Sequence, residues 1–178
     1  MKKVLALALS LSLILAIGIA GTLAWLTSTP EAITNTFTIG NVGITLAETT
    51  GTGDLTNRTY KVSPGTDVTK DPKVTVTAGS EPCYVFVKVE KSTGFDTYFT
   101  YAIATGWTAL DGNPGVYYRT YTTTDANATT DGYQILTDNK VTVKDDVTVF
   151  ASDPTLKFTA YAIQSAGFDD AAAAFAEF

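Results

Sequence analysis

The chain has 178 residues, a formal net charge of −6 at pH 7, no histidine and one cysteine, Cys83. Without histidine, Ser-His-Asp and Cys-His catalysis and an HExxH zinc site are excluded, and a single thiol excludes an internal disulfide. Scattered acidic charge also disfavours nucleic acid and anionic lipid as partners, since both require basic patches.

The N-terminus has the order of a secretory signal. Two lysines precede an uncharged, largely apolar run over 4–20, and Thr22 and Ala24 then occupy the two positions that a signal peptidase reads. This pattern predicts a signal peptide over 1–24, cleaved between Ala24 and Trp25, so that the protein meets the membrane only before cleavage. The expected location is therefore secreted, in the extracellular matrix or on the cell surface. The alternative is an uncleaved anchor, because the apolar run approaches the length of a membrane span.

The alternation of apolar residues changes phase near the start of the exported chain. Between 36 and 46 the apolar positions change from odd to even numbers, and the change falls at Gly40 and Asn41. One interpretation is an ordinary bulge within a single first strand. The other is an extended arm over 25–40, hinged at Gly40 and Asn41 to a domain over 41–178.

The middle of the chain has the composition and punctuation of short strands. Thr, Val and aromatic residues are frequent, and Gly, Pro, Asn and Asp recur at short intervals, which is typical of a sandwich or barrel. The clearest strand is expected over 83–91. Its alternation places four residues on one inward face: Cys83, Val85, Val87 and Val89. Cys83 is expected to be a small buried hydrophobe rather than a reactive thiol.

Further elements follow from the same patterns. Val74 and Val76 repeat the alternation, and a strand with one richly apolar face is expected over 155–163. Asp138-Asn139 is expected to be a hairpin turn between 134–136 and 141–144.

The last segment, 168–178, is alanine-rich and predicts a short helix with Asp169 and Asp170 at its positive end. The stripe expected to lie on the sheet consists of Phe168, Ala172 and Phe175.

Several stretches together resemble the TasA/camelysin family of secreted Gram-positive proteins. They are GTLAWLTS at 21–28, NTFTIG at 35–40, SPG at 63–65, TKDP at 69–72, SEPCYV at 80–85 and AYAIQ at 160–164. The resemblance implies an all-β, jelly-roll-like β-sandwich with an N-terminal signal helix and a short C-terminal helix. It also implies processing by a SipW-type signal peptidase.

The same resemblance implies assembly into extracellular fibres of a biofilm matrix, with the N-terminal arm inserted as a strand into the next subunit. The phase change near Gly40 fits such β-augmentation, and with the resemblance added we prefer the arm to the bulge. Head-to-tail donation gives filaments, by self-association or by co-assembly with related matrix proteins. The arm residues expected to fill grooves of the neighbour are Trp25, Leu26, Ile33, Phe37 and Ile39.

Two other functions compete with fibre assembly. A metallo-endopeptidase is suggested by the label of some camelysins, but catalytic zinc sites nearly always use imidazole ligands. The acidic pairs Asp145-Asp146 and Asp169-Asp170 are interpreted as a turn and as helix N-terminal acids. We therefore expect no catalytic residue, no metal site and no cofactor.

The other competitor is an extracellular carbohydrate- or surface-binding module. It would use exposed aromatic side chains of the loop-rich middle, although tyrosines in strands usually pack on the sheet. The candidates are Trp107, Tyr117, Tyr118, Tyr121 and Tyr133.

Overall fold

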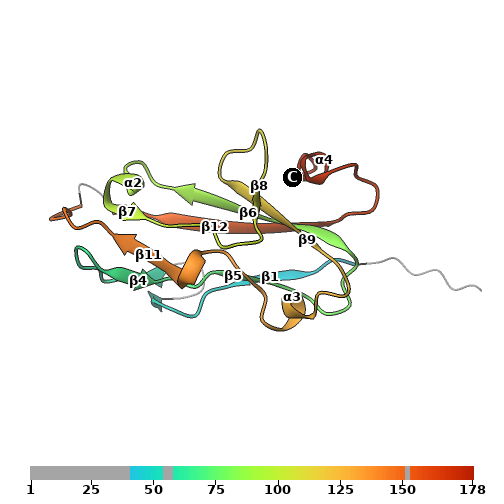
Figure 1. Ribbon diagram of the computed structural model, residues 1–178, viewed down its shortest axis with the longest axis horizontal. Coiled ribbons are helices and arrows are strands. Elements are labelled where there is room, and N and C mark those ends of the chain that lie inside the picture. The colour runs from blue at the N-terminus through green and yellow to red at the C-terminus, as the bar shows by residue number, and fades with distance from the viewer. Residues whose placement is uncertain (1–40, 54–57, 151–152) are drawn as a thin grey trace, which may run out of the picture. The chain divides into compact units, whose positions relative to one another are not determined.

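The computed structural model describes residues 41–53, 58–150 and 153–178 (Figure 1). The predicted leader over 1–24 and arm over 25–40 lie outside these residues. The prediction of an all-β fold is confirmed for the described residues, because strands dominate there and the helices among them are short. None of the helices within the described ranges is long and apolar enough to cross a membrane.

One antiparallel sheet has the strand order β12-β6-β9-β8. Its strands are β6 (Cys83–Lys91), β8 (Thr108–Ala109), β9 (Val116–Tyr121) and β12 (Leu156–Gln164). The predicted strand over 83–91 is confirmed to the residue, and Pro82 precedes it where a proline removes no ladder hydrogen bond. β6 pairs with β12 along its whole length and with β9 along most of it.

The second layer consists of two three-stranded sheets, β1-β5-β10 and β4-β11-β7. Their strands are β1 (Ile44–Ala47), β4 (Asp67–Thr69), β5 (Lys73–Val76), β7 (Phe99–Thr100), β10 (Tyr133–Gln134) and β11 (Lys140–Val143). Between these sheets, Ile135 donates its N–H to the Pro72 carbonyl at 3.0 Å and Ile103 forms a bridge with Leu136. β2 (Thr52–Gly53) and β3 (Arg58–Thr59) form a separate two-stranded sheet.

The predicted hairpin at Asp138-Asn139 is wrong. β10 pairs with β5 and β11 pairs with β4, so 133–143 runs on alongside 67–76 instead of folding back. Tyr133 pairs with Val74, and Lys140 pairs with Thr69. Six residues therefore lie between the two pairs on one side, 134–139, but only four on the other, 70–73. The 3₁₀ turn η1 (Thr137–Asn139) takes up the two extra residues, with φ of 53° and 51° at Asp138 and Asn139.

The main core lies between the two layers. The four inward residues predicted for β6 are at most 7% exposed and pack against β5 and β11, whose buried residues are Val74, Val76, Val141 and Val143. The prediction that Cys83 is a buried hydrophobe is confirmed, and burial raises the pKa of its thiol to about 11. The alternation of period two therefore identified the core face of the longest central strand.

A second apolar cluster covers the opposite face of β6 around Phe86. The predicted C-terminal helix is confirmed as α4 (Ala171–Phe175), but it buries Ala171 and Ala174 and leaves Ala172 exposed. β12 also differs from expectation, because its second face is covered as well. Tyr161 and Ile163 pack in this cluster, while Leu156 and Phe158 pack on the main core.

Candidate functional site

All the predicted interface residues lie outside the described part of the chain, as do both residues of the predicted cleavage site and the first of the two predicted hinge residues. These residues are Ala24, Trp25, Leu26, Ile33, Phe37, Ile39 and Gly40. Asn41 is described, and its carbonyl accepts the N–H of Glu81 at 2.9 Å. Two residues later, Gly43 donates to the hydroxyl of buried Ser80 at 3.1 Å. The start of the described domain is thus tied to the turn before β6.

The acidic pairs have the local roles expected of them. Asp145 and Asp146 form a turn after β11. Asp170 caps α4, since its carboxylate accepts the N–H of Ala173 at 2.8 Å. Within the described ranges no three Cys, Asp or Glu side chains lie close enough together to hold a metal ion.

The aromatic candidates for a glycan platform are largely covered. Trp107, Tyr121 and Tyr133 are buried, at 9%, 3% and 4% exposure, and Tyr117 and Tyr118 are half-buried. For the first three, the alternative that such rings pack on the sheet holds, because their strands and loops turn these rings inward onto the core.

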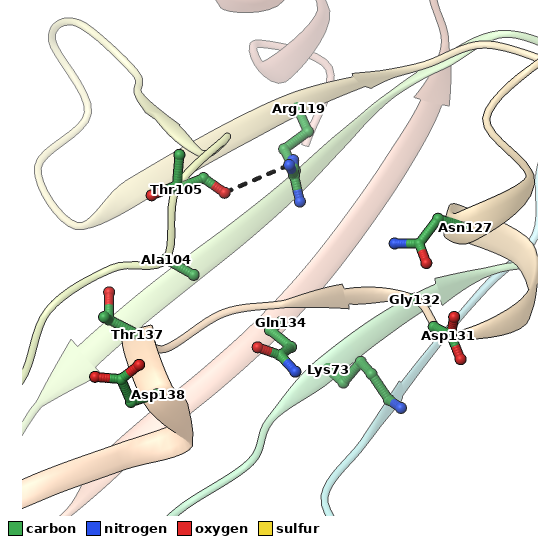
Figure 2. A pocket seen from close by; sticks show the side chains of 10 residues that line it. All are labelled: Lys73, Ala104, Thr105, Arg119, Asn127, Asp131, Gly132, Gln134, Thr137 and Asp138. Atoms are coloured by element: carbon green, nitrogen blue, oxygen red, sulfur yellow. Dashed lines mark hydrogen bonds between the residues drawn. The ribbon is translucent and has the colours of Figure 1, made fainter.

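A polar pocket of about 630 Å³ lies beside this buried aromatic group (Figure 2). Figure 2 shows Arg119 coming from β9, Lys73 from β5, Gln134 from β10 and Asn127 from α3 (Ala126–Thr130). The remaining lining residues are Ala104, Thr105, Asp131, Gly132, Thr137 and Asp138. β5 and β10 set Lys73 directly opposite Gln134.

Arg119 is held in place by the groups around it. Its guanidinium carbon lies 4.3 Å from the centroid of the Tyr133 ring and 5.6 Å from that of Trp107, which are cation–π distances. A terminal nitrogen donates to the Thr105 carbonyl at 3.4 Å. A Cβ at Gly106 would come within 1.8 Å of this group, so only glycine allows the guanidinium to lie there.

The rings beneath Arg119 are themselves fixed by hydrogen bonds. The Trp107 indole N–H donates to the Gln134 carbonyl at 2.7 Å, which joins the loop before β8 to β10. The Tyr133 hydroxyl donates to Asp125 at 2.7 Å, and Asp125 also caps α3. Burial and then this hydrogen bond raise the pKa of Tyr133 above its ordinary value, so Tyr133 stays a neutral donor.

This pocket was not predicted from the sequence, although one signal was present. In β9 the alternation places Arg119 on the same face as Tyr117 and Tyr121, which pack on the main core. A charged residue at a core-facing position usually has a special environment or role. The residues that line the pocket are spread along the sequence from Lys73 to Asp138. No local sequence pattern indicates that these segments meet in the fold.

No family model, curated protein or solved structure matches the chain.

Proposed function

We propose that the chain is a secreted, non-enzymatic structural protein of the TasA/camelysin type that assembles into extracellular fibres or biofilm matrix. The observation that carries the proposal is the order of segments in the sequence: a segment with the pattern of a cleavable leader over 1–24, a segment over 25–40 that contains regularly spaced large apolar residues, and a β-rich domain. The arm of one subunit adds a strand to the next, and repetition of this contact gives a filament.

The strand order supports a jelly-roll-like sandwich for the domain. In one layer, β10 and β11 form the central row. β5 and β4 pair with this row on one side, and Ile103 and β7 pair with it on the other. In the other layer β6 runs between β12 and β9. Strands distant in sequence therefore alternate as neighbours, which is how the two Greek keys of a jelly roll are built.

The edge at β12 supports strand donation. β1 pairs with β5 and lies close to β12 without pairing with it. Within the described ranges, β12 is paired along one side only, over nine residues that include a single charge, Lys157. Natural proteins usually shorten, charge or cover an edge of this length, because it would otherwise recruit other strands. The β12 edge is the acceptor that this proposal assigns to the arm.

The side chains of the arm then have separate tasks. Because Pro30 lacks an N–H and interrupts a ladder, pairing runs from Ile33 onward. Ile33, Phe37 and Ile39 share one face of an extended strand and fill the acceptor, while the segment at Trp25 is a separate anchor.

Deleting residues 25–39 tests the proposal. We expect the shortened protein to fold with an unchanged circular dichroism spectrum, to be monomeric by light scattering and to form no filaments in electron micrographs. A synthetic peptide of residues 25–40 added in excess should bind one to one without restoring filaments. Filaments that persist after the deletion would refute strand donation.

A pair of matched triple variants separates the two faces of the arm. Ile33→Ser, Phe37→Ser and Ile39→Ser together should abolish filaments, because they remove the apolar side chains and keep the length. Thr34→Ser, Thr36→Ser and Thr38→Ser, on the opposite face, should leave filament formation as in the wild type. Equal effects of the two sets would contradict the assignment of faces.

A further inference from the structure

We propose that the pocket around Arg119 binds the carboxylate of an acidic sugar, a uronate residue. This inference goes beyond fibre assembly and is independent of it, because no lining residue belongs to β12 or to 25–40. It also differs from a glycan platform of exposed rings, since here the rings are buried and a cation lies over them.

The pocket has more hydrogen-bond donors than its own acceptors use. Arg119 has five N–H groups, and the only hydrogen bond of its side chain among the described residues is the 3.4 Å contact with Thr105. The side chains of Lys73, Asn127 and Gln134 make no hydrogen bond or ion pair within the described ranges. Donor groups that line one pocket without protein partners favour a ligand rich in oxygen, and a guanidinium matches the two oxygens of a carboxylate.

The formal charges of the pocket lining cancel. Lys73 and Arg119 contribute two positive charges to the lining, and Asp131 and Asp138 contribute two negative charges. Such a lining does not suit a polyphosphate, which needs excess positive charge. It suits a ligand with one carboxylate for Arg119 and several hydroxyl groups, because these can donate to Asp131 and Asp138. A uronate has both kinds of group, whereas an acidic peptide side chain lacks the hydroxyl groups.

The Arg119 side chain is already ordered without a ligand. The guanidinium is held by the rings of Trp107 and Tyr133 and by the Thr105 carbonyl before any ligand binds. It occupies space that a side chain at Gly106 would fill. A cation that is held in this way loses less conformational entropy on binding. The pocket volume of about 630 Å³ is within the usual range for small-ligand sites.

The experiment is a titration of the purified full chain with glucuronate, glucose, acetate and inorganic phosphate. Calorimetry gives the dissociation constant, and the indole N–H resonance of Trp107 reports the site, because that group is bonded to Gln134. We expect glucuronate to bind with a constant on the order of 1 mM and to shift this resonance. The other three probes should bind at least about tenfold more weakly, because each lacks either the hydroxyl groups or the carboxylate.

Three variants assign the binding to the pocket. Lys73→Gln and Arg119→Lys should each weaken glucuronate about tenfold, the second because a lysine cannot bind a carboxylate with two parallel bonds. Lys61→Gln, at an exposed lysine that does not line the pocket, should change the constant less than twofold. The amide spectra of all three should otherwise match that of the wild type.

Some results would overturn the proposal. They are acetate or phosphate binding as tightly as glucuronate, no shift of the Trp107 indole at saturation, or equal loss of binding in Lys61→Gln and Lys73→Gln. Because these readouts do not involve filaments, failure here leaves fibre assembly standing, and failure of the arm deletion leaves the pocket standing.

Discussion

At the scale of single residues, Asp71 is the most heavily hydrogen-bonded carboxylate among the described residues. It accepts the N–H groups of Thr49 at 3.0 Å and Thr50 at 2.9 Å, and both of their hydroxyl groups also donate to it. Burial alone would raise the pKa of Asp71, but these hydrogen bonds outweigh it and lower the pKa to about 2. Asp71 therefore fastens the segment after β1 to the loop before β5.

This pKa predicts a pH dependence of stability. Because the folded pKa is below the value of 3.8 for an unperturbed carboxyl, the ionised form stabilises the fold above about pH 4. This contribution to the free energy of unfolding is lost as the pH falls from about 4 to 2. We expect the loss to be about 1 kcal/mol after allowing for solvent screening. Urea unfolding of the wild type and of Asp71→Asn over this range measures it.

The control for this measurement is Asp111→Asn, at an exposed aspartate in a turn. Asp111→Asn should retain the wild-type loss of stability between pH 4 and 2, whereas Asp71→Asn should show a smaller one. If both variants follow the wild type, Asp71 does not carry the effect.

At the scale of elements, α4 depends on its cap and on the aromatic cluster below it. A five-residue helix is unstable alone, and here the Phe175 ring lies 5.0 Å from that of Phe86. The Phe178 ring packs against the same group, 5.0 Å from Tyr161. The helix covers β6 in the sheet β12-β6-β9-β8, so loss of the cap would expose apolar surface.

Asp169 and Asp170 form a matched pair for testing the cap. Asp170→Ala removes the acceptor of the Ala173 N–H and should lower the free energy of unfolding by about 1 kcal/mol. Asp169→Ala removes a carboxylate at the preceding residue and should change the free energy of unfolding by less than about 0.5 kcal/mol. Denaturant unfolding and amide exchange in α4 measure both, and equal losses would show that charge rather than the cap matters.

How far the sequence predicts these elements depends on how local their causes are. Alternation identified β6, and alanine content identified α4, because both signals lie within one segment. The turn at Asp138-Asn139 was misread because a left-handed pair also starts a hairpin, and only the distant partners β4 and β5 decide otherwise. The Arg119 pocket was missed for the same reason, since its walls meet only in the folded chain.

At the scale of the whole molecule, the two layers are held together by packing. Cys83 lies on the core-facing side of β6, between β12 and β9, and is fully buried. A reagent can reach the thiol only if the layers separate or these neighbouring strands detach. Its reactivity therefore reports the opening of the main core rather than a local fluctuation.

Labelling with a thiol reagent tests this cooperativity. In the native state we expect Cys83 to react at least about 10³-fold more slowly than a free thiol, because the core opens only on global unfolding. The rate should rise with urea in parallel with the unfolding constant. A Cys83→Ala, Lys61→Cys variant, with the thiol at an exposed position, should react at the free-thiol rate throughout. Rapid labelling of native Cys83 would indicate that β6 opens locally.

The turn η1 has a consequence for how this chain tolerates changes of length. Because side chains alternate along an extended segment, an extra pair of residues returns the chain to the same face, whereas one or three would reverse it. Tyr133 before the turn and Val141 after it both face the main core. This is the orientation expected when the turn takes up two extra residues relative to the facing strands β4 and β5. Insertions here are thus subject to an even-number rule, and a single added residue would turn the valines of β11 out into water.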